Sequence, residues 1–150
     1  MYSFQCLHFD KLSTRQLYRI SALRQEVFVV EQNCPYLDAD GKDENAYHFM
    51  LWKNDDLVGY FRLLPKGLSY SDYVSIGRVV TAPLYRSQNL GRELMRQALI
   101  WCSILFPGEK IKISAQSHLE NFYGSFGFEP TGEYYLEDDI PHSAMVFMPR

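Results

Sequence analysis

The stretch IGRVVTAPLYRSQNLGRELMRQALIWCSIL, residues 76–105, decides the fold. Its β-branched run at 79–81 favours a strand, and Pro83 ends that strand. From Leu90 onward, apolar residues recur at three- and four-residue steps, which predicts a helix over 90–105 with one apolar stripe. A short polar loop separates the two. The stretch therefore predicts a strand, a loop and a long helix in that order.

The loop has the features of a phosphate site. Asn89 and Gly91 tolerate the positive φ values that a nest of backbone N–H groups requires. Unpaired N–H groups at the start of a helix, together with the positive end of its dipole, attract phosphate. Arg86 and Arg92 add positive charge at the same place. An ordinary strand–helix connection with two solvated arginines has the same spacing, so the loop alone leaves both interpretations open.

Composition predicts one soluble domain, residues 1–150. The chain has 150 residues, of which 47% are hydrophobic, enough for one core and too few for two. The net charge of −3 and the lack of a basic tract argue against a nucleic-acid partner. The N-terminus has no basic region of the signal-peptide kind, and the longest mostly apolar run, 98–106, is shorter than the roughly 20 residues that cross a bilayer. We therefore expect a cytoplasmic protein with a small-molecule partner and no membrane partner.

Cysteine and histidine usage gives no sign of a metal. Cys6, Cys34 and Cys102 are an odd number at long spacings, which indicates neither a disulfide framework nor a zinc knuckle and fits a reducing compartment. No pair of histidines has metal-ligand spacing. The segment DADGKD at 38–43 resembles a calcium loop superficially, but its glycine and acids do not have the offsets of an EF-hand.

The remaining pattern predicts an α+β protein of order β-α-β-β-β-α-β-α-β-β. We expect strands at 2–9, 46–52, 57–64, 73–81, 110–115, 134–136 and 144–148. Helices are expected at 14–30, 90–105 and from Ser117 to about 127, with capping boxes at Ser13/Gln16 and Ser117/Glu120. The acid-rich segment 31–45 is the longest irregular stretch, and 137–142 reads as a turn between the last two strands.

The chain resembles the GNAT N-acetyltransferases. Pro83-x-x-Arg86-x-x-Asn89-x-Gly91 is similar to their acyl-CoA loop, Arg/Gln-x-x-Gly-x-Gly/Ala, with Asn89 where the family usually has its first glycine. Within the family it looks most like the small bacterial ElaA-type proteins, through VFVVEQNCPY at 27–36, HLENFYGSFGF at 118–128 and DDIPH at 138–142. The resemblance covers essentially the whole chain. It implies a mostly antiparallel sheet with helices on both faces, and an enzyme that transfers acetyl from acetyl-CoA to an amine by direct attack on the thioester.

The resemblance also implies where acetyl-CoA binds, without a metal. The pyrophosphate would lie on backbone N–H groups from 87 to 92, the pantetheine amides on the strand at 79–81, and the thioester carbonyl near the N–H of Val80. Gln116 stands where many relatives carry an asparagine beside the pantetheine arm. The residues expected to contact acetyl-CoA are Val79, Val80, Thr81, Arg86, Ser87, Gln88, Asn89, Leu90, Gly91, Arg92 and Gln116.

Tyr123 is the candidate general acid. It matches the family tyrosine that protonates the departing thiolate. Reference pKa values of about 10 for tyrosine and about 8.5 for a thiol keep a phenol protonated at neutral pH, so it can donate as charge develops on sulfur. The alternative is a core aromatic, because Phe122 and Phe126 beside it are core residues of the same helix.

The base and the acceptor site stay open at this stage. Glu31 is the preferred base, with an ion pair to Arg24 or Arg78 as the alternative. A water chain would also serve. Asp38, Asp40 and His48 are further candidates for the base or for acceptor contacts, and Arg78 could hold an acceptor carboxylate, whereas the acids would attract a cationic amine. His118 and His142 are expected to be caps or surface residues.

Two other classes of function fit the same sequence. One is a module that binds acyl-CoA without turnover and acts as a sensor, and the other is a structural domain whose loop binds nothing. The 15% aromatic content suits either a core or the interface of a homodimer.

Overall fold

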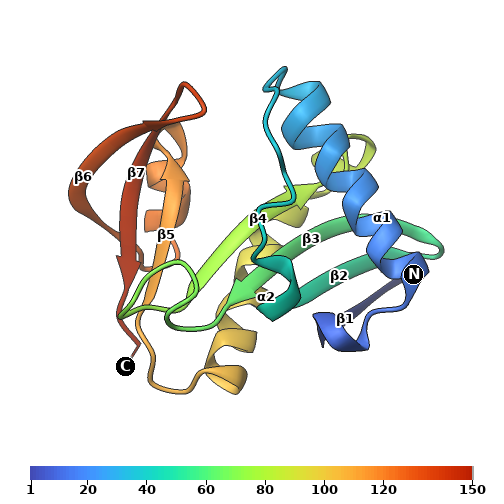
Figure 1. Ribbon diagram of the computed structural model, residues 1–150, viewed down its shortest axis with the longest axis horizontal. Coiled ribbons are helices and arrows are strands. Elements are labelled where there is room, and N and C mark those ends of the chain that lie inside the picture. Colours follow the sequence, from blue (N-terminus) through green and yellow to red (C-terminus); the bar gives the residue numbers. More distant parts are fainter. Residues whose placement is uncertain (150) are drawn as a thin grey trace.

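The computed structural model describes residues 1–149, which form two antiparallel sheets with helices packed on them (Figure 1). The first sheet has the order β1-β2-β3-β4, with β1 at Tyr2–His8, β2 at Tyr47–Lys53, β3 at Asp56–Leu64 and β4 at Ser75–Thr81. The second has the order β5-β7-β6, with β5 at Ile111–Gln116, β6 at Glu129–Glu137 and β7 at Ile140–Phe147. The α-helices are α1 at Thr14–Arg24, α2 at Leu90–Leu105 and α3 at Glu120–Gly124. The predicted α+β class is confirmed.

The two sheets are joined by backbone hydrogen bonds of one residue, Val74. Val74, just before β4, forms an isolated parallel bridge with Ile111 at the start of β5. Its N–H donates to the carbonyl of Lys110 (3.1 Å), and its carbonyl accepts from the N–H of Lys112 (2.9 Å). Beyond this point β4 and β5 diverge (Figure 1). Within residues 1–149, the edge of β4 that faces β5 therefore pairs with no other strand.

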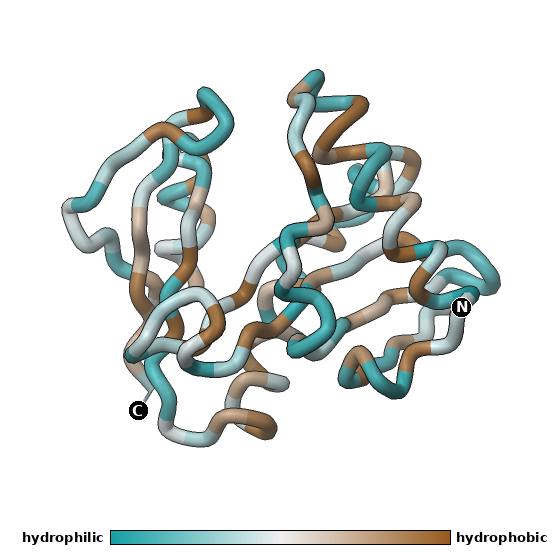
Figure 2. The backbone as a smooth tube through the Cα atoms, viewed as in Figure 1, coloured by the Kyte–Doolittle hydropathy of each residue, from teal (hydrophilic) through white to brown (hydrophobic). Residues whose placement is uncertain are grey.

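Helices cover both faces of the first sheet. Phe49 and Leu51 of β2 lie in the core cluster that contains α2, whereas Met50 lies in the cluster that contains α1. Because both faces are covered, β2 and β3 read as nearly continuous apolar runs rather than alternating ones. Hydrophobic stretches lie along strands and helices, and the tips of the loops are mainly hydrophilic (Figure 2). Within residues 1–149, no helix is both long and apolar enough to cross a bilayer.

The predicted apolar stripe of α2 is confirmed by the burial of Leu90, Leu94 and Ala98. Leu94 is completely buried, and its side chain lies against β3, where a Cβ built on Gly59 would be only 3.0 Å from Leu94 Cδ2. The glycine in β3 thus lets α2 approach the sheet closely.

The first helix begins as expected and continues in a different form. Ser13 Oγ accepts from the N–H of Gln16 (3.1 Å), and Gln16 Oε1 accepts from the N–H of Ser13 (2.8 Å), so the first capping box is confirmed. The helix expected over 14–30 is confirmed in extent, but it changes form after Arg24, because Gln25–Glu31 make a π-helix, η2. A π-helix has i→i+5 hydrogen bonds and is rare, and apolar residues at three- and four-residue steps do not predict it.

Two other expectations are wrong. Ser117–Leu119 form a 3₁₀ turn, η5, and α3 begins after Leu119 without a side-chain cap, so the second capping box is absent. The turn expected over 137–142 consists only of Asp138 and Asp139, whose φ values of 51° and 63° are those of a two-residue hairpin turn. His142 consequently belongs to β7, paired with Gln116 of β5 and with β6 on its other side.

A bulge interrupts β4. Val80 pairs with Tyr60, but Gly77 pairs with Arg62, so Arg78 and Val79 together oppose one residue of β3. Arg78 has a φ of 50°, the left-handed region that few residues other than glycine adopt. A bulge leaves one residue of the strand unpaired and increases the local twist, which contributes to the divergence of β4 from β5.

Charged groups hold the irregular segment 32–42 against the first sheet. Arg24, at the end of α1, is 3% exposed. Its Nε lies 2.8 Å from Asp38 Oδ2, its Nη1 lies 2.7 Å from Asp43 Oδ1, and its Nη2 donates to the carbonyl of Asp38 (3.0 Å). One buried guanidinium thus satisfies three acceptors from the segment that follows its own helix.

Arg62 of β3 completes the network. It is also 3% exposed, and its guanidinium binds both carboxylate oxygens of Asp40 and, at 2.8 Å, Oδ1 of Asp43. Arg78 adds a third guanidinium, with its Nε 2.8 Å from Asp38 Oδ1. Burial alone would raise the pKa of the Asp40 carboxyl, but the hydrogen bond and charge of Arg62 outweigh it and hold that pKa well below its usual range.

We expect Leu94→Ala to destabilise the protein by about 2–5 kcal/mol, because it leaves a cavity where α2 meets β3. Ile104→Ala, on the same helix with Ile104 58% exposed, should change the free energy of unfolding by less than about 0.5 kcal/mol. Urea unfolding of both variants measures the difference. Equal effects would contradict the assignment of Leu94 to the central contact.

We expect Asp43→Asn to cost about 3 kcal/mol at pH 7, because Arg24 and Arg62 both lose their shared carboxylate. Glu109→Gln, which breaks only the exposed pair with Lys66, should cost less than about 1 kcal/mol. Burial is outweighed by the two arginines, so the pKa of Asp43 is lowered in the folded state. The contribution of Asp43 to the free energy of unfolding is therefore complete at pH values above the pKa of an unfolded aspartate, about 3.9. That contribution is lost as the pH falls below this pKa and through the lower pKa of the folded state. Tm measured from pH 7 to pH 2.5 should fall less steeply in Asp43→Asn than in the wild type.

Candidate functional site

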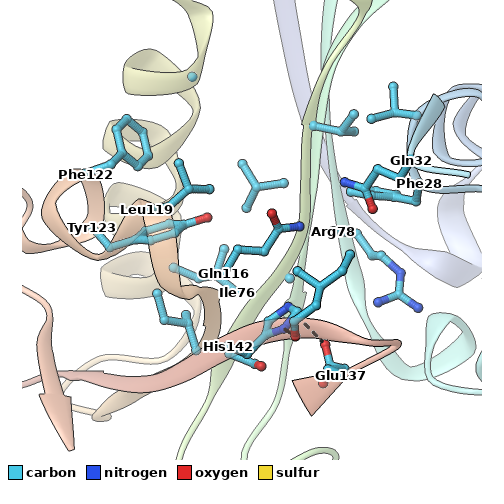
Figure 3. Close-up of a pocket in the computed structure, with 18 of the residues that line it drawn as sticks. Phe28, Gln32, Ile76, Arg78, Gln116, Leu119, Phe122, Tyr123, Glu137 and His142 are labelled. Carbon is cyan, nitrogen blue, oxygen red and sulfur yellow. Dashed lines mark hydrogen bonds and ion pairs between the residues drawn. The ribbon is translucent and has the colours of Figure 1, made fainter. Parts of the chain in front are cut away.

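A cleft of about 520 Å³ opens where β4 and β5 diverge (Figure 3). One wall is β4 with η2 and the segment that follows η2, and the other is β5 with α3 and the β6–β7 hairpin. β4 and β5 belong to different sheets, and within residues 1–149 the two sheets are joined only by the bridge between Val74 and Ile111. The cleft between the two walls therefore follows from the topology.

Part of the expected acetyl-CoA set lines this cleft. Val79, Val80, Thr81, Arg86, Gly91 and Gln116 do so. Ser87, Gln88 and Asn89 are exposed outside it, and the side chain of Leu90 is in the core. The Arg92 guanidinium lies 4.8 Å from the centre of the Phe126 ring, which makes a cation–π contact just after α3 in the chain.

The loop before α2 is more compact than the expected nest. Pro83–Gln88 form a 3₁₀ helix, η4, and Asn89 (φ 59°, ψ 29°) is the left-handed residue that turns the chain into α2. The expectation of a positive φ at Gly91 is wrong, because a single left-handed residue completes the turn and Gly91 already lies in the first turn of α2. Helix geometry leaves the N–H groups of that turn without intrahelical acceptors, at the positive end of the dipole.

Glu31 is paired with Arg86 rather than with Arg24 or Arg78. Arg86 Nη1 lies 2.8 Å from Glu31 Oε2, and Nη2 contacts Oε1, which makes a two-bond ion pair between η2 and η4. The hydrogen bond and charge of Arg86 lower the pKa of Glu31. A carboxylate with a lowered pKa is a weaker proton acceptor, and Glu31 is not among the residues that line the cleft.

Most of the residues expected to contact the acceptor lie outside the cleft, in the arginine network or in the core. Of Arg78, Asp38, Asp40 and His48, only Arg78 lines the cleft. His48 is completely buried, with its Nε2 2.9 Å from the carbonyl of Asp43 and its Nδ1 2.6 Å from the hydroxyl of Tyr60. Burial is the main cause that lowers the pKa of His48. These positions indicate a structural role for the acids and for His48.

Tyr123 lies on α3 with its hydroxyl pointing into the cleft (Figure 3). Its ring packs edge-on against Phe122 (5.2 Å) and Phe128 (6.2 Å). Burial raises the pKa of Tyr123, so the phenol stays protonated at neutral pH. The ring is thus packed among core aromatics while the residue borders the cleft, a position that is compatible with both interpretations of the sequence.

Sequence reasoning missed the residues at the far end of the cleft. They come from η2, from the segment after it, and from the β6–β7 hairpin, and include Phe28, Gln32, Cys34, Tyr36, Glu137, Asp138, Ile140 and His142. The adjacent Asp138-Asp139 is a signal for a tight two-residue turn, and would have placed residues 140–142 in a strand.

Comparison with known proteins agrees with this geometry. A family model described as an acetyltransferase (GNAT) domain matches residues 16–148. Protein ElaA of Escherichia coli (strain K12) is 46% identical over 148 residues, 97% of this chain and 96% of that protein. A crystal structure of an acyl-CoA N-acyltransferase from Pseudomonas aeruginosa matches with a TM-score of 0.94 and 42% identity, covering 98% of this chain and 99% of the other.

The crystal structure of Escherichia coli ElaA matches with a TM-score of 0.91 and 44% identity, again over 98% of this chain and 99% of the other. These similarities extend over nearly the full length of each chain, so they include both walls of the cleft. The chain therefore belongs to the GNAT acetyltransferase family, in the ElaA-like branch that its motifs predicted.

Proposed function

We propose that the protein transfers an acetyl group from acetyl-CoA to a primary amine by direct attack of the amine on the thioester. One observation carries the proposal: the free edge of β4, the first turn of α2 and the hydroxyl of Tyr123 border the same cleft. A thioester that is placed between the two sheets meets backbone donors on one wall and a proton donor on the other.

The edge of β4 suits the pantetheine arm, which carries amide groups. The N–H of Ala82 donates to the carbonyl of Val58 on β3 (2.8 Å), so alternation along the strand directs the N–H of Thr81 toward the cleft. The bulge at Arg78 and Val79 leaves a further backbone group unpaired beside Val80. We assign the pantetheine amides and the thioester carbonyl to these groups, with Gln116 on the opposite wall.

The first turn of α2 suits the pyrophosphate. Its N–H groups and dipole attract anions, and Gly91 keeps side-chain atoms away from the cleft at this point. Arg86 borders the same region. Its pair with Glu31 is exposed and therefore weak, so a pyrophosphate can replace the carboxylate as its partner.

Tyr123 then serves as the general acid. When the amine attacks the carbonyl carbon, the C–S bond breaks and negative charge develops on sulfur. A phenol with a raised pKa holds its proton until that charge appears, and then donates it. A sensor that binds acyl-CoA without turnover would need the cleft but not this hydroxyl, so the hydroxyl favours the enzyme.

We expect Gly91→Val to weaken CoA binding at least tenfold in a folded protein. A Cβ at residue 91 would lie 3.9 Å from Phe122 Cζ, so the branched side chain would occupy cleft volume beside the first turn of α2. Asn89→Gly is the matched control, since glycine adopts the left-handed conformation of residue 89 readily and should leave the affinity within about threefold. Calorimetric titration with CoA measures both. Unchanged affinity in Gly91→Val would remove the pyrophosphate assignment.

We expect Tyr123→Phe to lower kcat by roughly 10²- to 10⁴-fold, the usual contribution of a positioned acid. Tyr123 Oη makes no hydrogen bond with another of residues 1–149, so the free energy of unfolding should change by less than about 1 kcal/mol. Thiol release at saturating acetyl-CoA measures kcat, and Tyr18→Phe, with Tyr18 73% exposed, is the control. Normal turnover in Tyr123→Phe with a chemical step that limits the rate would contradict the assignment.

A further inference from the structure

His142 is the one histidine that lines the cleft within residues 1–149, which differs from the expectation of a cap or a surface residue. It lies on β7 with 7% of its surface exposed. Its ring stacks on Tyr135 of β6, with 6.2 Å between ring centres and 14° between planes. The hydroxyl of Tyr135 is in turn hydrogen-bonded to Ser114 Oγ of β5 (2.6 Å). The imidazole is therefore held in one orientation by all three strands of the second sheet.

The hydrogen bonds of the ring determine its tautomer. His142 Nδ1 lies 2.7 Å from the carbonyl oxygen of Ile140, which can only accept, so Nδ1 carries the hydrogen. Nε2 of the neutral ring therefore has a free lone pair. It makes no hydrogen bond with a donor among residues 1–149. A nitrogen that is nearly buried, oriented and without a donor is a proton acceptor ready for use.

Glu137 lies where it can stabilise the protonated ring. Its Oε2 is 3.5 Å from His142 Nε2, and both side chains border the cleft (Figure 3). The carboxylate gives no hydrogen to the neutral ring, but it attracts the imidazolium. Only the protonated form of His142 gains an attractive interaction with the Glu137 carboxylate, as when a catalytic base is paired with a charged group.

We propose that His142 is the general base of the transfer reaction and that Glu137 positions and stabilises it; the inference rests on the proposed function and adds the base that it lacks. The acceptor R–NH₃⁺ gives one proton to Nε2 and becomes R–NH₂. The nitrogen forms a bond to the thioester carbon, the C–S bond breaks, and Tyr123 protonates the thiolate. The second proton of the attacking nitrogen returns to the Tyr123 phenolate, and the imidazolium releases its proton to water.

The charges at this end of the cleft favour an acceptor that arrives protonated. Arg78, the cation on the opposite wall, is already bound by Asp38 at 2.8 Å. Glu137 pairs only with His142, and the Asp138 carboxylate makes no ion pair within residues 1–149. The local field is thus negative and attracts an ammonium group. An acceptor that is bound as an ammonium ion requires a base before it can attack, and His142 is in place for that step.

The groups near His142 that titrate or carry charge come from β6, from the hairpin tip and from the facing wall. They are Glu137, Tyr135, Asp138, Cys34, Tyr36 and Arg78. The β5 residue paired with His142, Gln116, is uncharged. Among residues 1–149, Glu137 is the only acid within ion-pair distance of the ring, so its neutralisation tests the partner of the imidazolium.

The tautomer is tested directly by nitrogen NMR of histidine-labelled protein. We expect the His142 signals to show hydrogen on Nδ1 and a bare Nε2 at high pH, with Nε2 protonated as the pH falls. A ring with hydrogen on Nε2 at high pH would overturn the proposal whatever the acceptor is.

Kinetics test the role in catalysis with two probes that differ in protonation. Putrescine is an ammonium ion at neutral pH, whereas methoxyamine is already a neutral amine. We expect His142→Asn to lower kcat/KM for putrescine by roughly 10²- to 10⁴-fold and for methoxyamine by less than about threefold. The asparagine amide can still donate to the Ile140 carbonyl, which preserves the hairpin. His118→Asn, with His118 exposed on η5, is the matched control and should be normal with both probes.

The pH profile separates a base from a structural histidine. In the wild type, kcat/KM for putrescine should rise with pH to a plateau, since the base must be unprotonated. In Glu137→Gln, kcat/KM should fall for putrescine and change less for methoxyamine, because the imidazolium that forms during the reaction loses its carboxylate partner. In His142→Asn the rate with putrescine should keep increasing with pH as free putrescine becomes available. Losses that are equal for the two probes, in His142→Asn or in Glu137→Gln, would overturn the proposal. Absence of thiol release by the wild type with both probes would instead contradict the proposed function, and the NMR result would then decide the state of His142 by itself.

Discussion

The hydrogen bonds that Val74 makes to Lys110 and Lys112 are the constraint on which the rest of the structure depends. They join the two sheets at one end only, so β4 and β5 run apart and each leaves one edge free. An unpaired edge normally attracts another strand. Here the edge borders the cleft, and we propose that it binds the extended, amide-bearing pantetheine arm. The same separation sets Tyr123 and His142 on one wall, opposite the backbone groups of β4.

The arginine network keeps the other wall in place. The segment 32–42 has no regular backbone bonding of its own, and it carries Cys34 and Tyr36 into the cleft. Arg24 and Arg62, both nearly buried, bind its aspartates and the neighbouring Asp43. Buried ion pairs add little net stability compared with apolar packing, but the loss of one partner is costly. Their effect is therefore to select one arrangement of a loop that would otherwise have many. The same network binds Arg78 through Asp38. The positive charge of Arg78 is thus compensated, and Glu137 and Asp138 of the β6–β7 hairpin make the proposed acceptor end of the cleft negative.

The proposed chemistry divides the cleft into two ends with different requirements. The end near α2 needs fixed donors for a polyanion, and backbone N–H groups supply them without side-chain entropy. The end near the β6–β7 hairpin needs a proton acceptor and a negative field for an ammonium ion, which side chains supply. Tyr123 borders the same cleft and supplies the proposed proton donor. Its ring packs among Phe122 and Phe128.

Patterns within a few neighbouring residues are enough to predict the local elements of this chain. Apolar spacing located α2 and most of the strands, and the Ser13/Gln16 pair located the start of α1. The family resemblance of the motif around Tyr123 suggested the acid that we propose. The tertiary structure decided what depends on partners far along the chain. Glu31 pairs with Arg86, fifty-five residues away, and the acids expected at a substrate site bind arginines of α1, β3 and β4. His142 became a cleft residue only through the register of β7 between β5 and β6. Propensity and capping act over a few residues, whereas the partner of a charge or the face of a strand is set by how distant segments pack, and no single stretch of sequence carries that information.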